Sequence, residues 1–198
     1  MGYLLGGSTA QLPGVPSESW DGTFEAMVRG VYQRNGIVAA CITARLTLIS
    51  EARFKWRRLN DRTMFGDTNL AILERPTPNA TTGDILARFE QDASLAGNGY
   101  WVRIGGDLHR VRPDWMHIIL GSNMADSYDI ADAPDASVVA YAYLPGGVTG
   151  KYKPRYFLPS EVAHYAPEPD PLARFRGQSW LTQVLTEVDT DRQLTQHK

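Results

Sequence analysis

Basic and aromatic side chains alternate in one short stretch of the chain. Arg53, Lys55 and Arg57 are separated by Phe54 and Trp56. A period of two is typical of a β-strand, so the pattern predicts a strand with one aromatic and one basic face. A basic face suits DNA phosphates or an acidic patch on another subunit. A charged strand edge that discourages aggregation is the remaining interpretation.

A further charged residue, Arg45, lies in an apolar segment. The segment from Gly36 to Ala52 has no proline and no internal glycine, which predicts a helix. At about 100° per residue its polar side chains share one narrow face, so we expect the rest to be buried. Arg45 falls within the apolar arc and needs a partner there. An internal carboxylate or carbonyl, or a salt bridge to another subunit, would serve.

Two glycine-rich motifs are weak matches to nucleotide-binding loops. The run from Gly146 to Tyr152 has its glycines one residue too close for a phosphate loop, and Tyr152 stands where the metal-ligating hydroxyl belongs. The run from Gly97 to Gly99 follows a predicted helix and lacks the third glycine of a dinucleotide fingerprint. We interpret both as turns and predict no bound cofactor.

The remaining candidates for catalysis are isolated residues. Three histidines fall on separate predicted strands without metal-ligand spacing, so we interpret them as core or rim residues and predict no metal: His109, His117 and His164. Ser179 lacks the second glycine of a nucleophile elbow and fits a helix N-cap better. Three carboxylates near the C-terminus fall on different faces of a predicted helix: Glu187, Asp189 and Asp191. The sequence predicts no catalytic residue.

Composition limits the class of protein. The 198 residues are 43% hydrophobic and 21% charged, which is typical of an ordered globular protein. The net charge of -2 gives no overall attraction to nucleic acid or membrane. Cys41 is the single cysteine, so an internal disulfide is excluded. No apolar run reaches the ~20 residues of a membrane helix, and we expect a cytosolic chain.

The periodicity predicts an α+β fold, with N-terminal helices packed on a mostly antiparallel, meandering sheet. Residues 1–22 read as a flexible arm, 23–166 as a mixed body, and 167–198 as a proline-rich connector and the start of a helix that looks truncated. Within the body, Thr81 and Asp84 have capping-box spacing and Gly97 fits a C-cap, which predicts a second helix. Five strands are expected after it: 100–104, 108–111, 115–120, 138–144 and 155–158.

The order of several short motifs resembles the portal family of long-tailed bacteriophages of the Hong Kong type. The resemblance rests on Asn35 opening a helix, Leu73 with Pro78-Asn79, Gly97-Asn98-Gly99-Tyr100, Arg112-Pro113 and Glu161-Val162-Ala163-His164. Its most specific part is the stretch from Pro169 to Leu181, which looks like portals of actinobacterial phages and prophages. It covers most of the chain, although family members run on for at least as long again.

The resemblance implies a structural role. Portal proteins form cyclic rings, typically dodecamers, at one capsid vertex of the virion, and double-stranded DNA passes through the ring during packaging and ejection. Expected partners are copies of the chain itself, the terminase large subunit, the major capsid or scaffold protein and a head-tail adaptor. ATP hydrolysis and DNA cutting belong to those partners. The chain would supply the outer, wing-like body, assembled in the bacterial cytoplasm.

Two other classes of function remain open from the residues alone. A metal-dependent DNA-processing hydrolase would use the carboxylates and histidines, and would lose activity when His164 is changed. A sheet-rich binding module would stay monomeric. The basic residues Arg53, Lys55, Arg57 and Arg45 are the candidate contacts to another subunit or to DNA phosphates.

Overall fold

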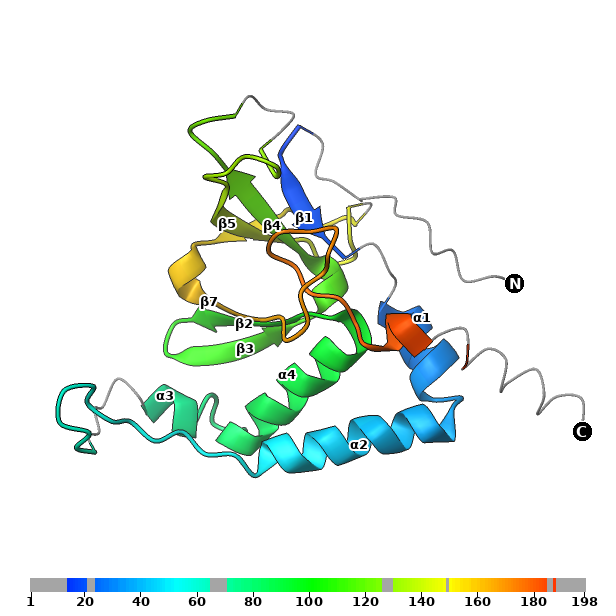
Figure 1. Cartoon of the computed structure of the whole chain (residues 1–198), viewed down its shortest axis with the longest axis vertical. Helices are drawn as coiled ribbons and strands as arrows, with labels where there is room; N and C mark the ends of the chain where they lie inside the picture. Colours follow the sequence, from blue (N-terminus) through cyan, green and yellow to red (C-terminus); the bar gives the residue numbers. More distant parts are fainter. Residues whose placement is uncertain are drawn as a thin grey trace, which may run out of the picture.

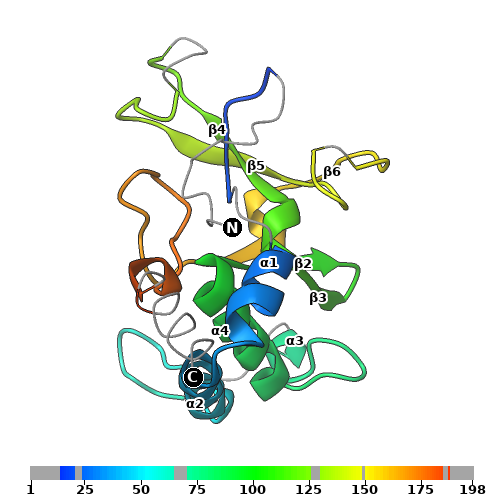
Figure 2. The same ribbon diagram turned by 90° about the vertical axis from the view of Figure 1, so that its right-hand side faces the viewer.

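Two antiparallel sheets and a layer of helices make up the fold, which confirms the predicted α+β class (Figure 1). The computed structural model describes residues 14–20, 24–64, 71–125, 130–148, 150–184 and 187. One sheet has four strands, the other has three, and the helices lie beyond the three-stranded sheet (Figures 1 and 2). The layers therefore follow the order sheet, sheet, helix.

The helices include both long helices that the sequence predicts. The helices are α1 (Phe24–Met27), the π-helix η1 (Val28–Tyr32), α2 (Gly36–Ser50), α3 (Ala71–Glu74) and α4 (Thr82–Ala96). Asn35 caps α2 by accepting hydrogen bonds from the amides of Ile37 and Val38, each at 3.0 Å. At α4 the capping box of Thr81 and Asp84 is confirmed. Gly97 ends α4 with a φ of 74°, a left-handed conformation that glycine adopts without strain.

The predicted sheet region is divided into two sheets. The four-stranded sheet has the order β1-β4-β5-β6, formed by β1 (Ser17–Ser19), β4 (Met116–Gly121), β5 (Ser137–Tyr143) and β6 (Arg155–Phe157). The three-stranded sheet has the order β3-β2-β7, formed by β2 (Gly99–Ile104), β3 (Asp107–Val111) and β7 (Val162–Tyr165). Short 3-10 helices, η3 (Pro113–Trp115) and η4 (Pro159–Glu161), precede β4 and β7. All strand pairs are antiparallel, as predicted.

The core has two main parts. Side chains between the sheets form one cluster, with Tyr100, Val102, Ile118 and Tyr141 among its buried members. The helices form the other around Ile42 and Leu95, and Leu181 from the far end of the chain completes it. Burial of such side chains stabilises each by about 1.5–3 kcal/mol. Both clusters therefore tie together segments that are distant in sequence.

The prediction that residues 1–22 lie outside the body is wrong for part of that range. Ser17–Ser19 form β1, which pairs with β4 at the register Ser17 to Ile119 and Ser19 to His117. Ser17 and Ser19 are buried. The segment is too short and too polar to read as a strand, and only pairing with β4 reveals it. Residues 1–13 and 21–23 lie outside the described residues.

Pro167, Pro169 and Pro171 predict a stiff, extended connector, but the segment is folded back. Residues 167–178, here called the strap, return on themselves through an antiparallel bridge between Pro169 and Gly177. The carboxylate of Glu18 accepts hydrogen bonds from the amides of Arg174, Phe175 and Arg176 at 2.9, 2.9 and 3.0 Å. These long-range bonds outweigh the stiffness of the prolines. The helix predicted from Ser179 is present at 181–184, and most of the rest lies outside the described residues.

Burial of α2 also differs from the prediction. Only Val38 and Ile42 are buried, whereas the side chains of Ile37 and Leu48 are 69% and 78% exposed. Figure 1 shows α2 at the margin of the molecule, with α4 between it and the three-stranded sheet. One neighbouring helix covers only one stripe of a helix surface, so the wide apolar arc of α2 exceeds what α4 can bury.

Candidate functional site

The basic stretch after α2 is not a strand. Residues 52–64, here called the basic hairpin, hold one isolated bridge between Arg57 and Met64. The amide of Arg58 donates to the carbonyl of Thr63 at 2.9 Å. Residues 52–56 have no strand partner, so the alternating pattern alone does not make a strand there. The Arg53 guanidinium instead donates to the carbonyls of Ser50 and Ala52 at the end of α2.

Local hydrogen bonds build the tip of the basic hairpin. The Asp61 carboxylate accepts from the amide and the hydroxyl of Thr63 at 2.9 and 2.7 Å, which lowers the pKa of Asp61. Arg62 has a φ of 58°, in the left-handed region that costs a residue with a side chain about 1–2 kcal/mol. Leu59 is fully exposed and Met64 is 55% exposed. The tip therefore presents the whole side chain of Leu59 and about half of that of Met64 to its surroundings.

Charge distinguishes the basic hairpin from the rest of the chain. Its sequence has one acidic residue, Asp61, and five basic residues: Arg53, Lys55, Arg57, Arg58 and Arg62. None of these five forms an ion pair with another described residue. A local excess of positive charge thus stands on a chain whose net charge is -2.

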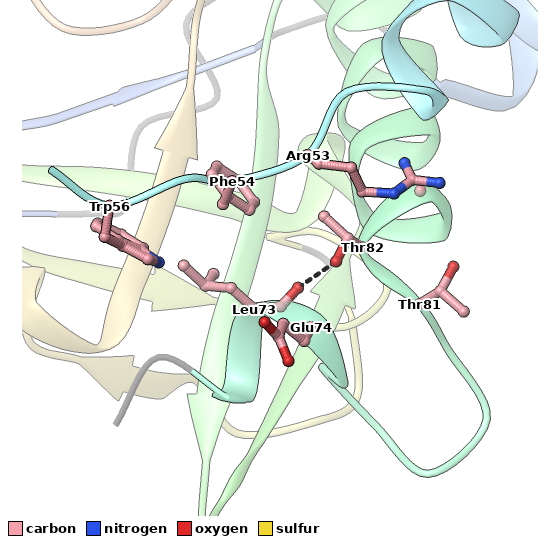
Figure 3. A pocket seen from close by; sticks show the side chains of 8 residues that line it. Arg53, Phe54, Trp56, Leu73, Glu74, Thr81 and Thr82 are labelled. Atoms are coloured by element: carbon pink, nitrogen blue, oxygen red, sulfur yellow. Dashed lines mark hydrogen bonds between the residues drawn. The ribbon is translucent and has the colours of Figure 1, made fainter. Parts of the chain in front are cut away.

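A pocket of about 430 Å³ opens at the base of the basic hairpin (Figure 3). The rings of Phe54 and Trp56 stack there with centroids 6.3 Å apart. The Thr82 hydroxyl closes the far side by donating to the Leu73 carbonyl at 2.7 Å. The lining residues are Arg53, Phe54, Trp56, Leu73, Glu74, Thr81, Thr82 and Gly83. The stacked rings give the pocket one aromatic side, and Arg53 and Glu74 add charged groups, which suits an apolar or planar group with a polar end.

Arg45 is paired with a buried carboxylate on α4. Its Nε lies 2.5 Å from Oε1 of Glu90 on α4, and the Glu90 side chain is 4% exposed. Ser94 and Tyr165 also donate to Glu90, at 2.9 and 3.3 Å. Of the interpretations left open by the sequence, the internal carboxylate pair is present. Arg53, Lys55 and Arg57 therefore come together in the basic hairpin, and Arg45 belongs to a separate network between α2 and α4.

The three histidines do not converge. His164 Nε2 lies 3.0 Å from Asn98 Oδ1, and its Nδ1 lies 3.5 Å from the Tyr141 hydroxyl. Burial lowers the pKa of His164 to about 4, so the ring is neutral at pH 7. His117 is buried and its pKa is also lowered, whereas His109 is exposed. Among the described residues, no group of three or more His, Cys, Asp or Glu side chains is arranged to hold a metal.

The two glycine runs and Ser179 are structural within the described part of the chain. Gly146 and Gly147 have φ values of 86° and 77° in a turn after β5. The Ser179 hydroxyl donates to the carbonyl of Ser94 at 2.6 Å and accepts from the amide of Leu181 at 3.1 Å, as a helix cap does. Glu187 is described and exposed, while Asp189 and Asp191 lie outside the described residues.

One charged region was missed by the sequence analysis. Between Gly121 and Ser137 the sequence has four aspartates and no lysine or arginine, and Asp132 and Asp135 are the two that the structure describes. We call the described residues 121–125 and 130–137 of this region the acidic loop. There the carboxylate of Asp135 accepts from the Ser122 hydroxyl and from the Asn123 amide, which lowers the pKa of Asp135. Asp132 is exposed, and Met124 is 73% exposed. A count of charge by segment would have found this region.

Comparisons by sequence find no relative: no family model matches the chain, and no curated protein matches it. None of the described helices is long and apolar enough to cross a membrane.

Solved structures do match the fold. A chain in the neck of an empty gene transfer agent particle, computed with sixfold symmetry, matches 88% of this chain with a TM-score of 0.65 and 16% identity. Chains in the virion of the native particle and in its neck computed with twelvefold symmetry match the same share, with TM-scores of 0.61 and 0.62 and 17% identity. This chain covers 43–44% of the length of those chains. At this identity the likeness shows a shared fold.

Proposed function

We propose that this chain is part of a structural subunit of a phage-like particle, in a portal ring at the junction of head and tail. The observation that carries the proposal is the match of 88% of the chain to chains in the necks of gene transfer agent particles. The motif order described above supports it independently, because that order depends on the sequence alone and the structural match on the fold. DNA passes through such a ring, and the chain itself performs no catalysis.

The basic hairpin is the part of the surface to which we assign assembly contacts. Ring subunits with heterologous contacts need two different complementary patches on each protomer. Arg53, Lys55 and Arg57 supply positive charge to such a patch or to DNA phosphates. In this proposal the other partners are a terminase, a head-tail adaptor and the capsid or scaffold protein, which would bind the assembled ring in the virion.

The symmetry of the matched assemblies supports a homo-oligomer. Those neck chains come from particles computed with sixfold and twelvefold symmetry. A closed ring presents every heterologous contact to a neighbour and leaves no free end, which ends growth at a fixed number of subunits. A chain with two distinct, complementary surfaces is suited to that geometry.

Native mass spectrometry of the chain, expressed through to its natural stop codon, tests the proposal. We expect closed rings of about a dozen subunits, the number compatible with the resemblance and with cyclic closure. A strictly monomeric protein at all concentrations would contradict the portal proposal and favour the binding module. Metal-dependent DNA cleavage that is lost in His164→Gln would favour the hydrolase instead.

A further inference from the structure

Two oppositely charged regions lie near opposite ends of the longest axis of the molecule. In Figures 1 and 2 the basic hairpin, coloured cyan, projects near the bottom, beyond the end of α2. The acidic loop, green to lime, lies at the top between β4 and β5 in both views. Because the two regions lie so far apart, they cannot neutralise each other within one protomer.

The composition of the basic hairpin favours a protein as its partner. Four of its five basic residues are arginine, and interfaces between proteins are enriched in arginine, aromatic residues and methionine and depleted in lysine. Its exposed apolar side chains, Leu59 and Met64, would gain nothing from the phosphate backbone of DNA. They would gain from removal of water in a protein interface.

The acidic loop has the complementary arrangement. Its described residues include the exposed side chain of Met124, the exposed carboxylate of Asp132 and the half-buried carboxylate of Asp135. The guanidinium of Arg174 donates to the carbonyls of Ala133 and Pro134 in the same loop, so Asp132 is the carboxylate most open to a partner. The bonds from Ser122 and Asn123 hold Asp135 ionised and fix the two ends of the loop to each other. Each region therefore combines an exposed apolar side chain with charged side chains, and the charges on the side chains of the two regions are of opposite sign.

From these observations we propose that the basic hairpin of one protomer docks on the acidic loop of a second copy of this chain. The proposal rests on the proposed function, because a head-to-tail contact of two different patches generates a ring when the rotation closes. Arg57, Arg58 and Arg62 face the aspartates across the contact, and Leu59 packs near Met124. The aromatic pocket at the base of the hairpin lies behind this contact.

A charge swap tests the contact. In the full-length chain, Arg58→Glu and Asp132→Arg should each reduce ring formation at least about tenfold, because each places like charges across the contact. The double variant should assemble to within about threefold of the wild type, since the pair is restored with reversed sign. Ring fraction is measured by native mass spectrometry and sedimentation at low and high salt, and circular dichroism checks that each variant is folded.

Matched controls separate this contact from general effects. Lys153→Glu reverses an exposed charge outside both regions and should leave assembly unchanged. Leu59→Ser should weaken assembly, whereas Leu172→Ser should not, although Leu172 is 92% exposed. If rings form equally well in both single charge variants, the contact is wrong and the ring proposal stands. If the wild type never assembles, the proposed function fails and the contact with it.

DNA binding is the competing outcome. Fluorescence anisotropy with a labelled DNA duplex would reveal it, because phosphate contacts weaken steeply as salt rises. A wild-type affinity for the duplex that Arg58→Glu abolishes, together with failure of Asp132→Arg to rescue assembly, would assign the basic hairpin to DNA and overturn the contact between copies.

Discussion

The fifteen-residue helices α2 and α4 pack against each other, but the more polar of the two is the more deeply buried. α4 has four charged side chains and eight buried residues, including Glu90 and Asp92. α2 has one charged side chain, Arg45, and two buried residues. Composition alone would have ranked their burial in the opposite order.

Pairing explains the difference. Glu90 meets Arg45 of α2, and Asp92 meets Arg110 of β3 through two hydrogen bonds of 2.7 and 2.6 Å. A buried carboxylate is tolerated when a cation and further donors satisfy it. The exposed apolar residues of α2 have no such requirement and no element to cover them. Position between two layers, rather than hydrophobicity, therefore determines how deeply each helix is buried.

The largest effect is expected when the ion pair between Asp92 of α4 and Arg110 of β3 is broken. Arg110→Ala should destabilise the protein by about 3–5 kcal/mol, because it leaves the carboxylate of Asp92 buried without its cation. Burial raises the pKa of Asp92 to about 6, and Arg110 opposes that rise, so the measurement belongs at pH 7.5 or above. Urea unfolding followed by circular dichroism gives the free energy.

The matched control is Glu51→Ala, which removes an exposed carboxylate at the end of α2. It should change stability by less than about 0.5 kcal/mol. Equal losses in both variants would show that pairing is not what holds α4 in place.

The second test concerns the imidazole of His164, a neutral, partly buried group that bonds Asn98 just after the end of α4. Because the pKa of His164 falls to about 4 in the folded protein, from an ordinary 6.5, the unfolded chain binds a proton first as the pH drops. Above pH 6.5 the titration of His164 does not change the free energy of unfolding. As the pH falls below 6.5 the protein loses stability, and the loss reaches about 3 kcal/mol near pH 4. The buried His117 adds loss in the same direction.

His164→Gln keeps groups able to bond Asn98 and Tyr141 but removes the titration. Thermal unfolding between pH 7.5 and 4.5 should therefore show a shallower decline for this variant than for the wild type. Identical slopes would mean that His164 is not desolvated, and that burial of polar groups around α4 is looser than its hydrogen bonds indicate.

The third test compares two apolar residues within α2. Ile42→Ala removes a fully buried side chain and should cost at least about 2 kcal/mol. Leu48→Ala removes a side chain that is 78% exposed and should cost less than about 0.5 kcal/mol in the monomer. Urea unfolding at matched protein concentration measures both. A large loss for Leu48→Ala would mean that this face of α2 is covered in solution.

Sequence patterns predicted the elements whose signals are local. The capping box of Thr81 and Asp84, the C-cap at Gly97 and five strands after it each depend on neighbouring residues, and the structure has them. A sixth strand in the described residues after Gly97, β7, was not among the five. The predictions for residues 17–19 and for the strap were wrong because both segments are held by distant partners. β1 pairs with β4 about a hundred residues away, and the strap is bonded by Glu18, 156 residues from Arg174. No local pattern carries such a contact.

In the candidate site, too, the sequence predicted what neighbouring residues determine and missed what distant partners determine. The sequence identified Arg53, Lys55 and Arg57 by composition but assigned them to a strand, since alternation is a property of spacing and not of a pairing partner. It left the partner of Arg45 open, and Glu90 is 45 residues away. The acidic loop has no periodic pattern that sequence analysis could detect. Its relation to the basic hairpin is visible only in the fold, which places the two at opposite ends of the molecule (Figure 1).

The bond between Glu18 and the strap has a consequence for the order of folding. The two ends of this contact are 156–158 residues apart, so a ribosome must synthesise all of the segment between them before the amides of Arg174 to Arg176 exist. Contacts of such long separation form late because their loop closure is entropically costly. β1 leaves the ribosome well before the strap, and its bonds to the strap form only after the strap has been synthesised. During synthesis the edge of β4 that β1 will cover is open to pairing with another nascent chain, and chains that meet there would swap their first strands.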